Sequence, residues 1–303
     1  MNKAPEYLNQ GDSVAIVATA RFMDKADIEK AASIIREAGY KVILGNNLDL
    51  IDNQYSGSDE ERASAFQSAL NNPEVKAIFC ARGGYGTVRI MDKLDWTSFL
   101  AKPKWILGFS DVTVLHSHLN EALSVQSLHS TMPITLINND HPDTQESNRK
   151  LFEVLSGKAN ETRFRSSLLH NPAFVEGEIV GGNLSILYSL LGSESCLKTE
   201  GKILFIEDLD EYLYHVDRMV MALSRAGKLD KLKAIIIGGM SDMNDNQIPF
   251  GKNAIQIIEE HTKDYGYPVV FDFPAGHQKK NYPIVMGKKA SLTFEGNFVD
   301  FKQ

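Results

Sequence analysis

SVAIVATARFMDKADIEKAASIIREAGYKVILG, residues 13–45, is the stretch that decides the fold of this chain. Its first six residues form a short apolar run rich in valine and isoleucine, which is typical of a buried strand. Residues 26–40 place apolar side chains at helical spacing, and Gly39 is a common helix stop signal. KVILG, residues 41–45, is a second apolar run, so strand, helix and strand predict a parallel βαβ unit. The predicted helical stripe consists of Ile28, Ala31, Ala32, Ile35 and Ala38.

The rest of the first half repeats this alternation of strands and helices. Residues 58–72 predict a helix, because Ser58 and Glu61 are spaced as a capping box. VKAIFCA, residues 75–81, and KWILGF, residues 104–109, predict the third and fourth strands. Repeated βα units require a parallel sheet with helices on both faces. The predicted fold class is therefore α/β, with a parallel sheet in the N-terminal domain.

The pattern loosens between residues 138 and 172, and we place the domain boundary in this region. NNDHPDTQESN, residues 138–148, is polar and rich in turn formers, so only a short helix is predicted, around residues 151–155. We divide the chain into an N-terminal domain of residues 1–168 and a smaller C-terminal β/α domain of residues 169–303.

The C-terminal half has its own rhythm. Residues 174–192 predict a strand, a glycine turn at Gly181 and Gly182, and a helix. Gly238–Gly239 is interpreted as another turn. The last run, residues 283–301, predicts paired strands rather than another βα unit.

Composition excludes several classes of function. The 303 residues carry a net charge of -7, which argues against a nucleic-acid partner. No apolar run approaches the roughly 18 residues that cross a bilayer, and the first residues lack the apolar core of a signal peptide. We therefore expect a cytoplasmic protein with no membrane partner. The two cysteines, Cys80 and Cys196, lie outside paired motifs, which disfavours disulfides and thiolate zinc sites.

Ser110 follows the fourth predicted strand, and ligands of parallel sheets bind beyond the carboxyl ends of the strands. A serine at this position is commonly a helix N-cap. Gly108, however, permits a tight turn that would project the Ser110 hydroxyl outward. The helix start would also aim the Asp111 backbone N–H at an oxyanion beside the serine. Ser110 is therefore a candidate nucleophile.

His277 and Glu207 follow two strands of the second half. His277 stands on a Pro-Ala-Gly loop after a strand, which makes it the candidate base. Glu207 ends the run ILFI and could hold His277 in the correct tautomer, or favour a helix N-terminus. The carboxylates around it lack a matching histidine motif, so we predict no metal and no cofactor. The remaining histidines are interpreted as helix-face or loop residues, with His116 and His118 pointing away from Ser110: His116, His118, His129, His141, His170, His215 and His261.

The loop Arg82-Gly83-Gly84-Tyr85-Gly86 follows the third strand. It has neither the Walker lysine pattern nor G-x-G-x-x-G, so it is a weak phosphate site. Its predicted nearness to Ser110 favours backbone donors for an oxyanion. Cys80, which precedes the loop, is interpreted as a buried small hydrophobic residue rather than a nucleophile.

Several segments together resemble the LD-carboxypeptidases, also called muramoyltetrapeptide carboxypeptidases. They run in family order along nearly the whole chain: GDSVAIVA, ARGGYGTVRIMDKLDW, PKWILGFSDVTVLH, GEIVGGNLSIL, ILFIEDLDE, AIIIGGM and FPAGHQKKNYPIVMGKKASL. Two loops depart from the family pattern. ATARF, residues 18–22, replaces a Pro-Ser turn, and His129-Ser130-Thr131 replaces His-Gly-Pro, so fine specificity is expected to differ.

The resemblance implies a serine peptidase with a Ser-His-Glu triad of Ser110, His277 and Glu207. It implies oxyanion donors at the Asp111 amide and at a glycine of the loop, which we take as Gly86. It also implies a flavodoxin-like N-terminal domain, an active site between the domains and a homodimer. The substrate would be a small peptide, the murein tetrapeptide, losing its terminal D-alanine during wall recycling.

A carboxypeptidase must bind a free terminal carboxylate, and Arg82 is the candidate because its guanidinium can pair with it in bidentate fashion. An internal salt bridge of Arg82 is the alternative. Two other functions stay open: a peptidase acting on peptidyl-nucleotides, resembling the microcin-immunity peptidases, and a non-enzymatic peptide or sugar binding module. Three polar residues placed after three strands favour catalysis over binding alone.

Overall fold

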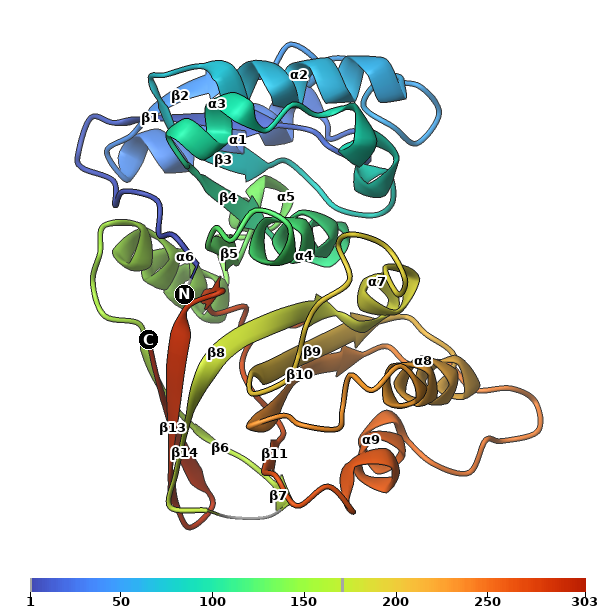
Figure 1. The fold of residues 1–303 in the computed structure, drawn as a ribbon. Coiled ribbons are helices and arrows are strands. Elements are labelled where there is room, and N and C mark those ends of the chain that lie inside the picture. The colour runs from blue at the N-terminus through green and yellow to red at the C-terminus, as the bar shows by residue number, and fades with distance from the viewer. Residues whose placement is uncertain (1, 170–171) are drawn as a thin grey trace.

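The computed structural model describes residues 2–169 and 172–303, and it contains two β-sheets in two halves of the molecule (Figure 1). The first sheet has the strand order β12-β5-β4-β3-β1-β2. The second has the order β6-β14-β13-β8-β9-β10-β11-β7. The mixed α/β fold class that the sequence predicts is confirmed.

The first sheet is parallel except at one edge. β1 pairs in parallel with β2 and β3, β3 with β4, and β4 with β5, whereas β12 is antiparallel to β5. The parallel strands follow the order 2-1-3-4-5, which is that of flavodoxin-like folds. The strands are β1 (Ser13–Val17), β2 (Lys41–Leu44), β3 (Val75–Cys80), β4 (Trp105–Gly108), β5 (Ser127–His129) and β12 (Ile284–Met286).

Helices cover both faces of this sheet, because successive side chains of a strand point to opposite faces. Val14 and Ile16 of β1 join the core beneath α1 and α6, whereas Ala15 and Val17 join the core beneath α2 and α4. The predicted capping box of α2 is present, since Ser58 Oγ accepts the Glu61 N–H at 3.2 Å. The helices are α1 (Lys25–Glu37), α2 (Asp59–Asn71), α3 (Thr97–Ala101), α4 (Thr113–Glu121), α5 (Pro133–Leu136) and α6 (Pro142–Leu155), with 3₁₀ turns η1 (Thr87–Lys93) and η2 (Ser110–Val112).

The helix α6 is much longer than the short helix predicted around residues 151–155. It begins at Pro142, a residue favoured in the first helical position, and the His141 side chain accepts the Asp143 N–H at 3.2 Å. Its first turns look like a loop in the sequence because the face they bury is polar. Ser147 and Asn148 lie on that buried face, and Asn148 donates to the Leu136 carbonyl at 3.2 Å.

The second sheet is parallel at its centre and antiparallel at its edges. β8, β9, β10 and β11 run in parallel, while β13, β14 and β6 extend one side and β7 closes the other. α7 (Leu184–Ser189), α8 (Leu213–Arg225) and α9 (Ala254–Thr262) pack on the same apolar core. The strands are β6 (Glu161–Arg165), β7 (Leu168–Leu169), β8 (Phe174–Asn183), β9 (Ile203–Leu209), β10 (Ala234–Ser241), β11 (Val269–Val270), β13 (Lys289–Glu295) and β14 (Phe298–Lys302).

Two glycine pairs that were predicted as turns lie inside strands instead. Gly181 and Gly182 belong to β8, and Gly238–Gly239 belongs to β10. A Cβ on Gly182 would lie 2.5 Å from Thr113 Oγ1 of α4. Gly182 therefore permits close approach of β8 to α4, the helix that follows Ser110. The glycine is required by a contact with a residue distant along the chain and not by a turn. The paired strands predicted at the C-terminus are confirmed by the antiparallel β13 and β14.

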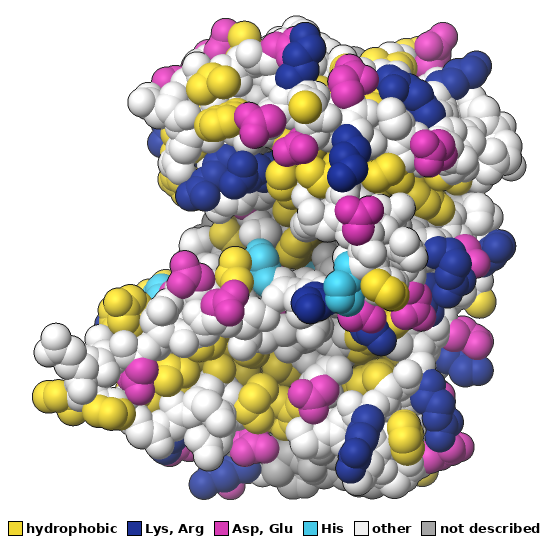
Figure 2. Space-filling view, turned by 180° about the vertical axis from the view of Figure 1, so that it is seen from behind, with side chains coloured by type: hydrophobic (Ala, Val, Ile, Leu, Met, Phe, Trp, Pro, Cys, Tyr) yellow, Lys and Arg dark blue, Asp and Glu magenta, His cyan; other side chains and the backbone are white. Residues whose placement is uncertain are grey.

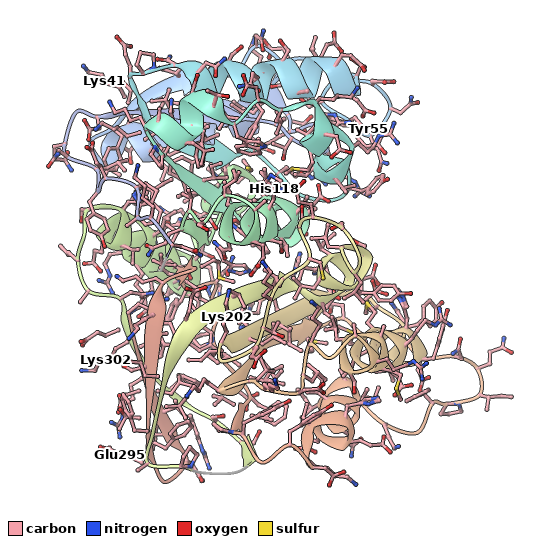
Figure 3. All side chains as sticks on the ribbon, viewed as in Figure 1. Lys41, Tyr55, His118, Lys202, Glu295 and Lys302 are labelled. Carbon is pink, nitrogen blue, oxygen red and sulfur yellow. The ribbon has the colours of Figure 1, made fainter. Side chains whose placement is uncertain are left out.

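The two halves are joined by polar contacts as well as by packing. Thr113 Oγ1 of α4 accepts the Asn183 N–H of β8 at 3.0 Å. Lys202, labelled in Figure 3, pairs with Glu121 of α4 at 3.1 Å and with Glu178 of β8 at 2.9 Å. The chain does not divide cleanly between the two sheets, because β6 belongs to the second sheet and β12 to the first. The domain boundary after residue 168 stays a prediction. No helix in the described ranges is long and apolar enough to span a bilayer.

Candidate active site

Ser110 stands in a strained turn at the carboxyl end of β4. Gly108 has φ 151° and Ser110 has φ 62°, and the latter conformation is rare for a serine. Such strain costs about 1–3 kcal/mol and persists where the surroundings impose it. The N-cap interpretation is wrong, because Val112 occupies the N-cap position of α4. Within the described chain the Ser110 hydroxyl has no hydrogen-bond partner, so no hydrogen bond joins it to His277, the candidate base. The sharp strand-to-helix turn resembles that of a nucleophile elbow.

The buried ring of His116 is hydrogen-bonded to the backbone of this turn. Its Nε2 lies 2.9 Å from the Gly108 carbonyl oxygen, and its Nδ1 lies 2.8 Å from Ser127 Oγ. Burial lowers the pKa of His116 to about 4, so the neutral ring donates to Gly108 and accepts from Ser127. The prediction that His116 points away from the Ser110 turn is therefore wrong.

Backbone donors for an oxyanion lie beside Ser110. A Cβ built on Gly83 would lie 3.2 Å from Ser110 Oγ and 3.4 Å from the Asp111 nitrogen, so Gly83 borders both. Gly86, the predicted donor, has other contacts. Its carbonyl accepts from Arg62 at 2.9 Å, and the next residue, Thr87, donates its backbone N–H to the Asp111 carboxylate at 2.9 Å. The structure thus brings Gly83 and the Asp111 amide to the nucleophile.

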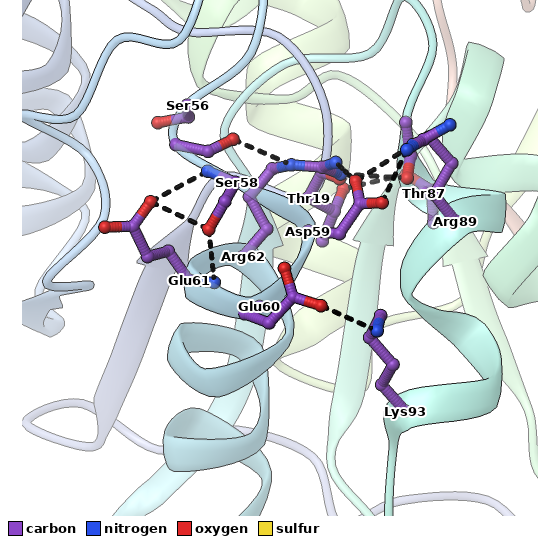
Figure 4. Close-up of polar contacts among 12 residues, drawn as sticks. Thr19, Ser56, Ser58, Asp59, Glu60, Glu61, Arg62, Thr87, Arg89 and Lys93 are labelled. Carbon is purple, nitrogen blue, oxygen red and sulfur yellow. Dashed lines mark hydrogen bonds and ion pairs between the residues drawn. The ribbon is translucent and has the colours of Figure 1, made fainter.

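A buried arginine, Arg62, is hydrogen-bonded to the glycine loop and belongs to the polar network shown in Figure 4. Arg62 of α2 is fully buried, and its Nη1 donates to the carbonyls of Thr19 and Gly86. Its Nη2 pairs with Asp59, which Arg89 of η1 also binds at 2.7 Å. Sequence reasoning missed Arg62, although the signal was an arginine on the same helical stripe as the buried Phe66 and Ala69.

Glu207 and His277 form a close pair from two different elements. Glu207 lies near the carboxyl end of β9 and is fully buried, and its Oε2 lies 2.7 Å from His277 Nδ1. The same oxygen accepts the His277 backbone N–H at 3.1 Å. Gly276 makes this approach possible, because a Cβ there would lie 2.6 Å from Glu207 Oε2. The His277 ring in turn packs against Phe109, the neighbour of Ser110, with ring centroids 4.8 Å apart.

The electrostatics of the pair favour a protonatable base. Burial alone would lower the pKa of His277, but the hydrogen bond and charge of Glu207, with the charge of Asp208, raise it above its usual value. Burial and the neighbouring Glu207 charge raise the pKa of Asp208 to about 7. Because Glu207 accepts Nδ1–H, the other ring nitrogen of neutral His277 is left as a proton acceptor.

Asp208 and Asn183 connect the pair to the nucleophile helix, and sequence reasoning missed this connection. Asp208 accepts from Asn183 Nδ2 at 2.8 Å and from the Ser185 N–H of α7 at 2.9 Å. Asn183 donates its own backbone N–H to Thr113, close after Ser110. The arrangement ties β8, β9 and α4 together at one point.

The other predicted residues fall into clear places. Burial raises the pKa of Cys80 to about 12, which agrees with a buried apolar role. His215 pairs with Glu211 at 2.6 Å and His261 with Asp217 at 2.8 Å. His118 contacts Ser195 at 3.1 Å, and His129 is fully buried among aromatic rings. His170 lies outside the described residues. Within the described ranges, no cluster of three or more His, Cys, Asp or Glu is placed to hold a metal ion.

Arg82 has no acidic partner among the described residues, so the predicted salt bridge is absent there. Its guanidinium donates to the Phe22 carbonyl oxygen at 3.2 Å, on the β1 side of the sheet. The molecule is hollowed between its two halves, and histidine side chains lie at this hollow (Figure 2). A cavity of about 420 Å³ is lined by both Phe109 and His277. Space for a ligand therefore adjoins the catalytic candidates.

Comparison with known proteins places this chain in a family. Residues 14–130 match the family described as LD-carboxypeptidase N-terminal domain, and residues 176–292 match LD-carboxypeptidase C-terminal domain. The probable murein peptide carboxypeptidase of Bacillus subtilis is 33% identical over 294 residues, covering 96% of this chain and 92% of that protein.

Two further proteins represent the two enzyme classes considered. The crystal structure of muramoyltetrapeptide carboxypeptidase from Oxalobacter formigenes matches with a TM-score of 0.86 and 27% identity, covering 96% of this chain and 98% of that one. Microcin C7 self-immunity protein MccF of Escherichia coli is 23% identical over 326 residues, covering 97% of this chain and 94% of that protein.

Proposed function

Because this chain belongs to the LD-carboxypeptidase family, we propose that it is a serine carboxypeptidase that releases the terminal D-alanine of murein tetrapeptides. The observation that carries the proposal is the buried pair of Glu207 and His277 held against the strained turn of Ser110. A free serine hydroxyl, an oriented histidine and backbone donors are the parts that acyl transfer requires.

The proposed first step is attack by Ser110. Its hydroxyl proton passes to the free nitrogen of His277 as Oγ bonds to the scissile carbonyl carbon. The carbonyl oxygen becomes an oxyanion, for which the Asp111 and Gly83 amides are the proposed donors. Gly83 replaces Gly86 in this proposal because Gly83 borders Ser110.

The proposed second step releases the terminal residue. The bond between carbonyl carbon and nitrogen breaks, and His277 returns its proton to the leaving amine. Water then attacks the Ser110 ester, with His277 again taking the proton, and the shortened peptide leaves. Glu207 stabilises the imidazolium in both halves and stays ionised throughout.

Arg82 is proposed to bind a carboxylate of the substrate. Its guanidinium carries one backbone hydrogen bond and no acidic partner in the described chain, so donors remain for a planar anion. A homodimer and a cytoplasmic location complete the proposal, and light scattering of the purified protein tests the first.

The proposed function is tested by incubating the protein with a free murein tetrapeptide and measuring D-alanine. Substrates ending in D-alanine, L-alanine and D-alanine amide should differ strongly, with the D-terminal acid preferred. Equal release from all three would reject the carboxypeptidase while leaving serine hydrolysis standing. The similarity to the microcin self-immunity protein makes a peptidyl-nucleotide analogue the second substrate to assay. Specific binding of the tetrapeptide without any release would favour the binding-module alternative.

A further inference from the structure

Two residues that line the cavity beside His277 carry buried polar side-chain atoms without a hydrogen-bond partner in the described chain. The cavity is lined by Phe109 and His277 on the catalytic side and by Thr131, Lys279 and Asn281 beyond them. Thr131 is 2% exposed and Asn281 is 3% exposed, yet Thr131 Oγ1 and Asn281 Nδ2 have no hydrogen-bond partner in the described chain. Leaving such groups unpaired is costly, so their retention in a cavity points to a ligand.

The orientation of Asn281 is set by its neighbour. The Gly276 N–H donates to Asn281 Oδ1 at 2.9 Å, which assigns the oxygen to that side. The amide nitrogen is therefore the unpaired atom, and it can only donate. Thr131 can donate as well. Both groups would therefore be satisfied by a hydrogen-bond acceptor.

The charge of the cavity matches an anionic acceptor. None of the residues that line it is aspartate or glutamate. Lys279 lines it and forms no ion pair with any acid in residues 2–169 and 172–303. The neighbouring Lys280 differs, because its ammonium lies 3.6 Å from Asp143. A carboxylate in this cavity would offer acceptor oxygens to these donors and a negative charge to the Lys279 ammonium.

The sheet order places this cavity on the leaving-group side of the nucleophile. β4, which leads to Ser110, lies between β3, which leads to Gly83, and β5, which leads to Thr131. The oxyanion donors therefore lie on the β3 side and the cavity on the β5 side. His277 must protonate the leaving nitrogen, so the released residue sits next to His277, whose ring lines the cavity.

We propose that Thr131, Asn281 and Lys279 form the subsite for the terminal carboxylate of the released residue. That carboxylate is attached to the same carbon as the leaving nitrogen, so its subsite must adjoin His277, as this cavity does. The inference rests on the proposed carboxypeptidase activity. Binding of the terminal carboxylate, first expected of Arg82, is thereby assigned to residues on the β5 side of Ser110. Arg82, on the β3 side, would instead bind a carboxylate in the part of the peptide that stays attached to Ser110.

The test measures kcat/KM for two tetrapeptides that differ only in a terminal D-alanine or D-alanine amide. Thr131→Val removes the hydroxyl at nearly constant shape, and Lys279→Gln removes an exposed charge. Each should lower kcat/KM on the acid about three- to thirtyfold and change it less than about twofold on the amide, because a charge-assisted hydrogen bond is lost. The preference for the acid over the amide should therefore shrink in both variants.

Three matched variants serve as controls. Thr162→Val removes another buried hydroxyl without a partner, in β6 of the second sheet, and Lys280→Gln removes the adjacent lysine charge. Both should keep the wild-type preference, and Arg82→Gln should weaken both substrates alike. Thermal unfolding is measured for every variant, because a substitution of the buried Thr131 could destabilise the protein. Lys279→Gln tests the same subsite at an exposed position, where the substitution should not affect folding.

An unchanged preference in Thr131→Val and Lys279→Gln would overturn the subsite, and so would loss of the preference in Arg82→Gln alone. Wild-type protein that releases D-alanine from neither peptide would instead reject the proposed function, and the subsite with it. The two failures are distinct, because the first leaves D-alanine release intact.

Discussion

A single oxygen, Oε2 of Glu207, holds both the ring of His277 and the loop that carries it. It lies 2.7 Å from Nδ1 and accepts the backbone N–H of the same residue at 3.1 Å. The histidine therefore has its position, its orientation and its tautomer set by one buried carboxylate. The Ser241 hydroxyl donates to the His277 carbonyl from the end of β10 and fixes the loop from the other side.

Replacing Ser110 should abolish turnover without unfolding the protein. Ser110→Ala removes the proposed nucleophile, and the corresponding loss in the subtilisin example is about 10⁶ in kcat. Cys80→Ser is the comparison, because burial holds the pKa of that thiol near 12 and leaves no thiolate at neutral pH. Initial rates of D-alanine release measure both. If Cys80→Ser were slow and Ser110→Ala stayed active, Cys80 and not Ser110 would be the nucleophile.

Glu207→Gln should lower kcat far more than it raises KM. The carboxylate stabilises an imidazolium that exists only during the reaction, and the equivalent amide substitution in a serine protease costs about 10⁴ in kcat. Gln also presents an amide N–H toward Nδ1 in one orientation, which favours the wrong tautomer. Separate determination of kcat and KM decides the matter. A variant with full kcat and a raised KM would make Glu207 a substrate contact.

The pH profile should show an acid limb set by His277. Its ring must be neutral to accept the Ser110 proton, and Glu207 raises its pKa, so activity falls as pH drops through a value above the usual histidine value of about 6.5. In Glu207→Gln the limb should move to lower pH. An identical limb in both enzymes would assign it to another group. The raised pKa also means that this pair stabilises the fold most below about pH 6.5 and loses that contribution as pH rises through the folded-state pKa.

Chelators should leave the activity unchanged. The carboxylates at the carboxyl end of β9 and just after it are hydrogen-bonded to protein groups: Glu207 to His277, Asp208 to Asn183, and Glu211 to His215. Activity is compared before and after dialysis against EDTA, with zinc added back to one sample. Loss on dialysis with recovery on zinc would contradict the triad.

Gly182→Ala should destabilise the protein and reduce its rate. A Cβ there would lie 2.5 Å from Thr113 Oγ1, on the helix that follows Ser110, and the backbone φ of 142° adds strain. Overpacking of this kind costs about 1–3 kcal/mol, which denaturant unfolding measures. Gly192→Ala is the control, because its φ is also positive but nothing lies within 4 Å of the new atom. Equal effects of the two substitutions would show that backbone strain alone is responsible.

The candidate catalytic residues could be predicted because each follows a predicted strand. Ser110 follows β4, Glu207 lies near the carboxyl end of β9, and His277 lies in the loop after β11, so all three stand toward the carboxyl ends of parallel strands. The oxyanion role of Gly86 stays a prediction, and the glycine loop shows the limit of this reasoning. Three glycines of one loop look alike in sequence, and only the path of the backbone decides that Gly83 borders Ser110.

The sequence by itself determined the parallel α/β sheet, because alternating apolar periods of strand and helix are local patterns that need no partner. It also determined which side chains follow the strands. Tertiary structure alone decided that Arg62 supports the glycine loop, that His116 reaches back to Gly108, and that Thr131 and Asn281 share one cavity. These groups are distant in the chain or lie on helix faces that appear ordinary. Their roles arise from burial, which makes a polar group depend on whichever atom the fold places beside it.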